Sequence, residues 1–215
     1  MMLTYFGKGR SAGAAPAFGA IQAVRGYWEA LRTGGALPRR DQIDPRGIAQ
    51  ALENVFLIER IAPGLARFRL AGMHVNDIMG LDVRGMPLTT LFEPNARTRI
   101  TDALEPVFAG PSVLEIWLEA ERGIGKPALE ARMILLPLTG SAGEPGLALG
   151  CLASVGTIGR MPRRFGVAGL VREPLAAPTA ELLVARDYSF AEAAVTYLPP
   201  PPRGKPHLRL VHSQD

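Results

Sequence analysis

The chain has 215 residues, a length that allows one domain of moderate size with extensions, and its single cysteine excludes an internal disulfide framework. No apolar run approaches the roughly 18 residues of a membrane span and the N-terminus does not resemble a secretory signal, so we expect a cytoplasmic protein without a membrane partner. The formal net charge of +4 comes largely from residues 1–40, where no recognition helix, zinc-finger spacing or interleaved aromatic residues accompany it, so we expect no specific nucleic-acid partner.

The first predicted element is a helix over residues 18–33, preceded by a Gly/Ala/Ser-rich tail, 1–17, that we expect to be disordered. Apolar side chains recur in this helix at spacings of three, four and three, which is typical of a helix lying along another surface. These residues are Ile21, Val24, Trp28 and Leu31. The stripe either covers the sheet of its own domain or forms an interface with a second subunit.

Two strands are predicted next, over residues 55–61 and 65–70, because both segments are rich in β-branched and apolar residues. Pro63 and Gly64 between them are typical turn residues. The alternation in the second strand places Phe68 and Leu70 on the inward face and the two intervening arginines on the other.

A cluster of short helical segments is predicted between the first two strands and the next three. Residues 73–79 form a short helix closed by Gly80, residues 88–92 form another turn, and Pro94 opens a longer helix over 95–109. The apolar stripe of this longer helix should cover one face of the sheet.

Three further strands are predicted over residues 114–119, 128–137 and 147–155, connected as a meander. In the first of them Trp117 alternates onto the outward face beside Glu115 and Glu119. A tryptophan there needs cover, from the N-terminal helix or from a second subunit, so we count it among the interface candidates.

The C-terminal part is predicted to lie outside the core domain, which we place at residues 18–158. Residues 159–198 are expected to be an extension with short helices, and residues 199–215 a disordered proline-rich tail.

Five motifs in order resemble the compact PAS family typical of alphaproteobacteria: Tyr27–Arg32, Leu37–Arg40, Ile43–Pro45, Phe68–Gly72 and Leu135–Leu138. The resemblance covers roughly residues 25 to 158. It implies an α+β fold with a five-stranded antiparallel sheet, helices on one face and a preceding N-terminal helix. It also implies a sensory or regulatory role in bacterial signalling, and a homodimer in which helices preceding the sheet take part.

A ligand pocket of such a domain would lie between the inner face of the sheet and the helical cluster. Ordinary core packing explains the same apolar residues equally well. His74 is the one histidine placed to act as a polar handle, and the alternative is a partly exposed side chain. The candidate lining residues are Phe68, Leu70, His74, Ile78, Leu91, Phe92, Ile100, Leu104, Met133 and Leu135.

Cofactor chemistry finds little support in the sequence. Residues 72–109 contain no cysteine that could react with a flavin, and residues 95–109 contain no histidine for haem, so the ligand is unknown. Cys151 falls on an apolar strand face, where a buried, inert thiol is expected.

The function predicted from the sequence is binding without catalysis. No Ser-His-Asp or metal-binding set can be assembled from the single histidine of the core, and we expect a sensor for a small apolar ligand, a signalling partner protein, or both. Two alternatives stay open. One is a small-molecule enzyme on a cone-like α+β fold, and the other is a pure protein–protein interaction module with a filled core.

Overall fold

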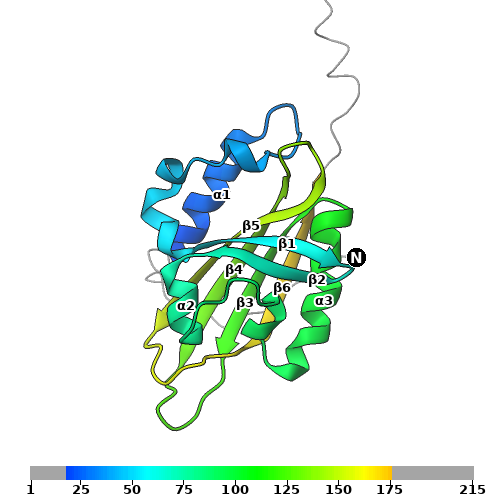
Figure 1. The fold of residues 1–215 in the computed structure, drawn as a ribbon. Coiled ribbons are helices and arrows are strands. Elements are labelled where there is room, and N and C mark those ends of the chain that lie inside the picture. Colours follow the sequence, from blue (N-terminus) through cyan, green and yellow to red (C-terminus); the bar gives the residue numbers. More distant parts are fainter. Residues whose placement is uncertain (1–17, 176–215) are drawn as a thin grey trace, which may run out of the picture. The chain divides into compact units, whose positions relative to one another are not determined.

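A computed structural model describes residues 18–175, and these form one antiparallel sheet with helices on both faces (Figure 1). The sheet has six strands in the order β2-β1-β5-β4-β3-β6. Their bounds are β1 Val55–Ala62, β2 Leu65–Ala71, β3 Ser112–Ala120, β4 Leu129–Thr139, β5 Pro145–Gly156 and β6 Phe165–Pro174. The predicted α+β class and the five predicted strands are confirmed.

The helices divide between the two faces of the sheet. The elements α2, η4 and α3 pack on one face, and α1 and η3 pack on the other. The α-helices are α1 Gly19–Leu31, α2 Met73–Met79 and α3 Pro94–Ala109; the 3₁₀ helices are η2 Arg40–Gln42, η3 Pro45–Asn54 and η4 Leu88–Leu91.

Local turn chemistry sets several of these boundaries. Gly64 makes the β1–β2 turn with a φ of 68°, and Gly80 ends α2 with a φ of 71°, a backbone region that favours glycine. The β1–β2 turn is also fastened to α3, because the Gly64 amide donates to the Glu105 carboxylate at 2.7 Å. That carboxylate also pairs with Arg60 of β1, and both partners lower the pKa of Glu105.

The sheet has one strand more than the five that were predicted. Strand β6 pairs antiparallel with β3 along its whole length, from Ser112↔Pro174 to Ala120↔Phe165. Its start is anchored by the buried Phe165, whose carbonyl accepts a hydrogen bond from the Glu93 amide at 3.0 Å. The expected extension 159–198 therefore begins with a strand of the same sheet, which was missed because glycines at 166 and 169 weaken its strand pattern.

Helix α1 covers the face of the sheet opposite to the helical cluster. Ile21, Val24 and Trp28 are buried against β4 and β5, and the Trp28 indole Nε1 donates to the Pro137 carbonyl at 3.0 Å. The apolar stripe thus covers the sheet of its own domain, as the first of the two interpretations had it.

Several predictions fall outside the described residues, namely the tails 1–17 and 199–215 and the part of the extension from residue 176 to residue 198. Within the described residues, no helix is long and apolar enough to cross a membrane.

Candidate functional site

The structure brings most of the predicted pocket residues together on one face of the sheet, and they fill the space between them. Eight of them are at most 1% exposed and belong to a single core cluster. Across this core, the rings of Phe56 and Phe68 meet edge to face at 5.3 Å, and Phe56 lies directly over Gly150. The eight are Phe68, Ile78, Leu91, Phe92, Ile100, Leu104, Met133 and Leu135.

We expect Leu104→Trp to destabilise the protein by about 1–3 kcal/mol, because a larger side chain in a filled core forces its neighbours out of their rotamers. Leu104 is fully buried on α3 in this core. Thermal and urea unfolding of the full chain measure the loss. Unchanged stability would mean that the core holds a cavity large enough for an indole ring.

Leu70 does not belong to this core, which corrects the prediction that it points inward. Ile58 pairs with Phe68 but Leu57 pairs with Leu70, so β2 has one extra residue at this point. Such a bulge turns the following side chain to the opposite face of the sheet. Leu70 is 53% exposed and lies on the α1 side.

The same face holds an apolar groove of about 280 Å³. Its floor is formed by Leu57, Leu70 and Leu149 of the sheet, and its wall by η3 and the segment before it. One charged side chain, Arg40, lies at its edge. The full lining is Arg40, Ile43, Pro45, Ile48, Leu52, Val55, Phe56, Leu57, Leu70, Ala71, Gly72 and Leu149.

His74 lies on α2 at the end of the packed core and is partly buried. Its Nε2 is 3.0 Å from the Ser154 hydroxyl of β5, which gives the imidazole a structural hydrogen-bond partner. Burial lowers the pKa of His74, while the carboxylates of Glu53 and Asp77 act in the opposite direction. The neutral ring is thus favoured, and it ties α2 to the sheet.

The predicted interface residues largely pack within the chain itself. Ile21, Val24 and Trp28 are buried, which corrects their assignment to a subunit interface, and Leu31 is partly buried. Trp117 is also partly buried, beside the Arg132 guanidinium at 5.8 Å and the backbone of Gly169 in β6.

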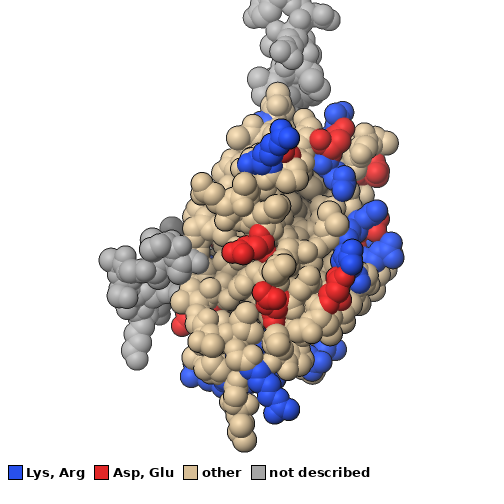
Figure 2. Space-filling model, turned by 60° about the vertical axis from the view of Figure 1, so that its left-hand side comes forward, with Lys and Arg blue, Asp and Glu red and all other residues tan. Residues whose placement is uncertain are grey.

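Charges on this side of the sheet are paired as well. Arg25 of α1 reaches Glu115 at 2.7 Å and also pairs with Glu173, contacts that raise the pKa of the arginine. Figure 2 shows basic and acidic side chains interspersed on one face rather than gathered in a basic stripe.

The sequence raised two further kinds of chemistry, a reactive cysteine thiol and a metal site. Cys151 is buried, and burial raises the pKa of its thiol to about 12, so it is inert as predicted. Among residues 18–175, no group of three or more His, Cys, Asp or Glu side chains is placed to hold a metal ion.

Comparison with protein families matches residues 18–153 to the family described as the PAS domain. The chain belongs to the PAS-domain family. The matched segment runs from the start of α1 into β5 and stops before β6, so the sixth strand of this PAS domain lies beyond it. Curated protein sequences give no match.

Solved structures similar to this PAS domain include a photoreceptor domain and a histidine kinase/response regulator. The light-state LOV domain of the blue-light photoreceptor Aureochrome1 is 17% identical over 52% of this chain and 88% of its own, with a TM-score of 0.37. A sensory box histidine kinase/response regulator from Burkholderia thailandensis E264 is 19% identical over 52% and 85%, with a TM-score of 0.34. Neither neighbour informs the choice of ligand.

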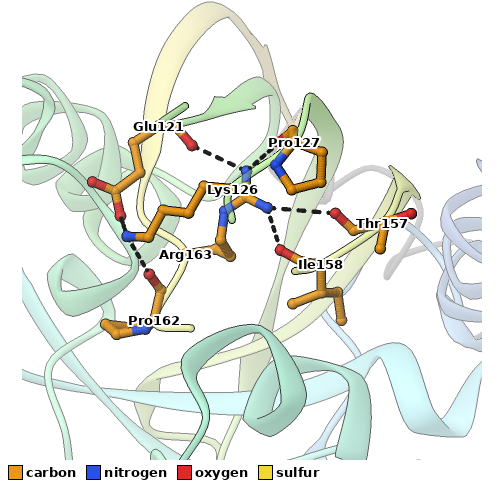
Figure 3. A network of polar contacts seen from close by, with 7 residues as sticks. All are labelled: Glu121, Lys126, Pro127, Thr157, Ile158, Pro162 and Arg163. Carbon is orange, nitrogen blue, oxygen red and sulfur yellow. Dashed lines mark hydrogen bonds and ion pairs between the residues drawn. The ribbon is translucent and has the colours of Figure 1, made fainter. Parts of the chain in front are cut away.

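One feature of this PAS domain was not foreseen from the sequence, a fully buried arginine (Figure 3). The Arg163 guanidinium donates to the carbonyls of Glu121 at 3.0 Å, Pro127 at 2.7 Å, Thr157 at 3.4 Å and Ile158. Its backbone amide also donates to the Ile78 carbonyl at 2.9 Å. Arg163 thereby joins the β3–β4 hairpin, the segment after β5 and the end of α2.

A surface ion pair closes the same cluster. Lys126 binds the Glu121 carboxylate and donates to the Pro162 carbonyl at 2.9 Å. The side-chain hydrogen bond from Lys126 is the main cause that lowers the pKa of Glu121. This cluster holds the hairpin in place, and its ligands are backbone carbonyls, so we assign it a structural role.

Proposed function

We propose that this PAS domain is a sensory or regulatory module that acts by binding and not by turnover. The observation that carries the proposal is membership of the PAS family over residues 18–153. The five motifs within that segment favour the compact type found in alphaproteobacteria, and hence a bacterial, cytoplasmic protein. A small apolar ligand, a signalling partner protein, or both would be what it binds.

The distribution of ionisable groups favours binding over catalysis. An enzyme on this fold would need two ionisable side chains that converge in a pocket. Among the described residues the one fully buried charged side chain is Arg163, and its hydrogen bonds go to carbonyls. His74 forms a hydrogen bond with Ser154, but among the described residues no third group forms a hydrogen bond with the imidazole ring.

The filled core supports a second candidate, a module whose partner is another protein. The eight buried candidate residues are at most 1% exposed in one core cluster, which leaves no room for a flavin ring among them. A signal received by this domain would then enter and leave through its surface.

We further propose a homodimer whose contact lies outside the α1 stripe, since that stripe is buried in the chain itself. Native mass spectrometry of the freshly purified full chain tests the dimer and the retained ligand together. We expect twice the chain mass, with an added small-molecule mass in the ligand-bound case. A monomer with no added mass, and with no partner protein that binds it, would contradict the proposed function.

A further inference from the structure

The groove on the α1 side of the sheet exposes apolar surface that the fold itself does not cover. Leu52 of η3 is 47% exposed and Leu70 of β2 is 53% exposed, and both line the groove. Water in contact with exposed leucine side chains is unfavourable, so an apolar molecule that binds in the groove and buries them is favoured. We therefore expect the part of a ligand that lies in the groove to be apolar.

The backbone fixes two sides of this groove relative to each other. The bulge in β2 turns Leu70 towards it, and the Gly72 Cα packs so closely on the Glu53 carbonyl that a Cβ there would lie 2.2 Å from the oxygen. Gly72 thus fixes the end of η3 against the end of β2.

The size of the groove limits the ligand. A dry cavity of ~150 Å³ in another protein binds benzene, and typical ligand pockets have about 300–1,000 Å³. A volume of about 280 Å³ therefore suits a molecule of about ten non-hydrogen atoms. This size excludes a flavin or a haem and favours an alkyl chain of medium length or a single substituted ring.

The charged side chain at the edge of the groove indicates that the ligand has a polar group at one end. Arg40 is exposed and has no ion pair or side-chain hydrogen bond among the described residues, whereas its neighbour Arg39 binds Asp41 at 3.0 Å. A guanidinium binds a carboxylate through two parallel hydrogen bonds. No acidic side chain lines the groove to compete for it.

We propose that this groove binds a small amphipathic monocarboxylate, with its apolar body over Leu57 and Leu70 and its carboxylate on Arg40. This inference rests on the proposed sensory function and names its site and ligand class. The site lies on the opposite side of the sheet from the packed core.

The wall of the groove also connects the ligand to α1. The Asp44 amide donates to the Tyr27 hydroxyl at 2.7 Å, and Gly47 of η3 packs on the same tyrosine ring. A ligand that contacts Ile43, next to Asp44, therefore contacts a segment fastened to α1. Helix α1 is therefore the element that would respond when a ligand occupies the groove.

Octanoate, with ten non-hydrogen atoms, is the probe, and octan-1-ol is the same chain without the charge. We expect octanoate to bind the full chain in a ligand-observed NMR titration. Arg40→Gln should weaken octanoate at least about tenfold and leave octan-1-ol unchanged, because it removes only the charge-assisted contact. Arg39→Gln is the matched control, and it should change octanoate affinity less than about twofold.

Leu70→Glu should abolish binding of both probes, because it places a negative charge in the groove. Leu81→Glu is its control, since Leu81 is similarly exposed, at 46% against 53% for Leu70, and does not line the groove. Circular dichroism checks that each variant is folded.

Failure of octanoate to bind, or equal effects of Arg40→Gln and Arg39→Gln, would overturn the carboxylate site. If native mass spectrometry still shows a retained molecule in that case, the sensory function stands and only the site is wrong. If Leu70→Glu instead converts a dimer to a monomer without any octanoate binding, the groove belongs to a second copy of the chain and the proposal is overturned.

Discussion

Arg163→Met is expected to lower the free energy of unfolding by about 3 kcal/mol or more, because it leaves the carbonyls of two segments buried without their donor. The guanidinium is fully buried and binds the carbonyls of Glu121 and Pro127 in one segment and of Thr157 and Ile158 in another. Methionine is shorter but has a similar side-chain volume and no donor, so the loss of stability reports the hydrogen bonds more than the volume. Urea denaturation of the full chain measures it as a lower midpoint at an unchanged slope.

Arg164→Met is the matched control, because the next side chain along the chain is exposed. It should change stability by less than about 0.5 kcal/mol. Similar effects of the two substitutions would mean that the cluster of Figure 3 contributes only its charge, and not its hydrogen bonds.

Turns and helix ends were predictable because their signals are local. Gly64 and Gly80 both adopt a positive φ, which glycine reaches without steric cost, and each stands where the predicted element ends. The stripe of α1 was predictable for the same reason, since its period of apolar residues is visible within one segment. Which surface the stripe covers is a property of the whole chain, and the sequence left two choices.

The face of Leu70 was not predictable from alternation. A strict period of two places it beside Phe68, but the register of β2 on β1 contains one extra residue, and that register is set by pairing between strands. The error matters for function, because Leu70 moves from the packed core to the groove. The groove itself also needs η3, which the sequence did not predict.

Arg163 had no sequence signal either. Its carbonyl partners at Glu121 and Pro127 lie 42 and 36 positions away in the chain. An arginine that directly precedes Arg164 in the sequence resembles a solvated surface charge. Only the meeting of the hairpin with the segment after β5 makes it a buried hydrogen-bond donor.

Trp28→Ala is expected to destabilise the protein by about 3–5 kcal/mol, through the cavity that it leaves between α1 and the sheet. Trp28 is fully buried, and its indole donates to the Pro137 carbonyl of β4 at 3.0 Å. Trp28→Phe separates the two contributions. It keeps most of the apolar ring and removes the donor, so it should cost about 1–3 kcal/mol.

The Trp28→Ala variant also decides between the two roles of the α1 stripe. If the stripe covers its own sheet, Trp28→Ala lowers stability equally at low and high protein concentration, and light scattering of the folded protein shows an unchanged oligomeric mass. If Trp28 contributed mainly to a subunit interface, the loss would depend on protein concentration and the mass would fall. Because Ile21 and Val24 are buried beside it in the same cluster as the sheet residues, we expect the first result.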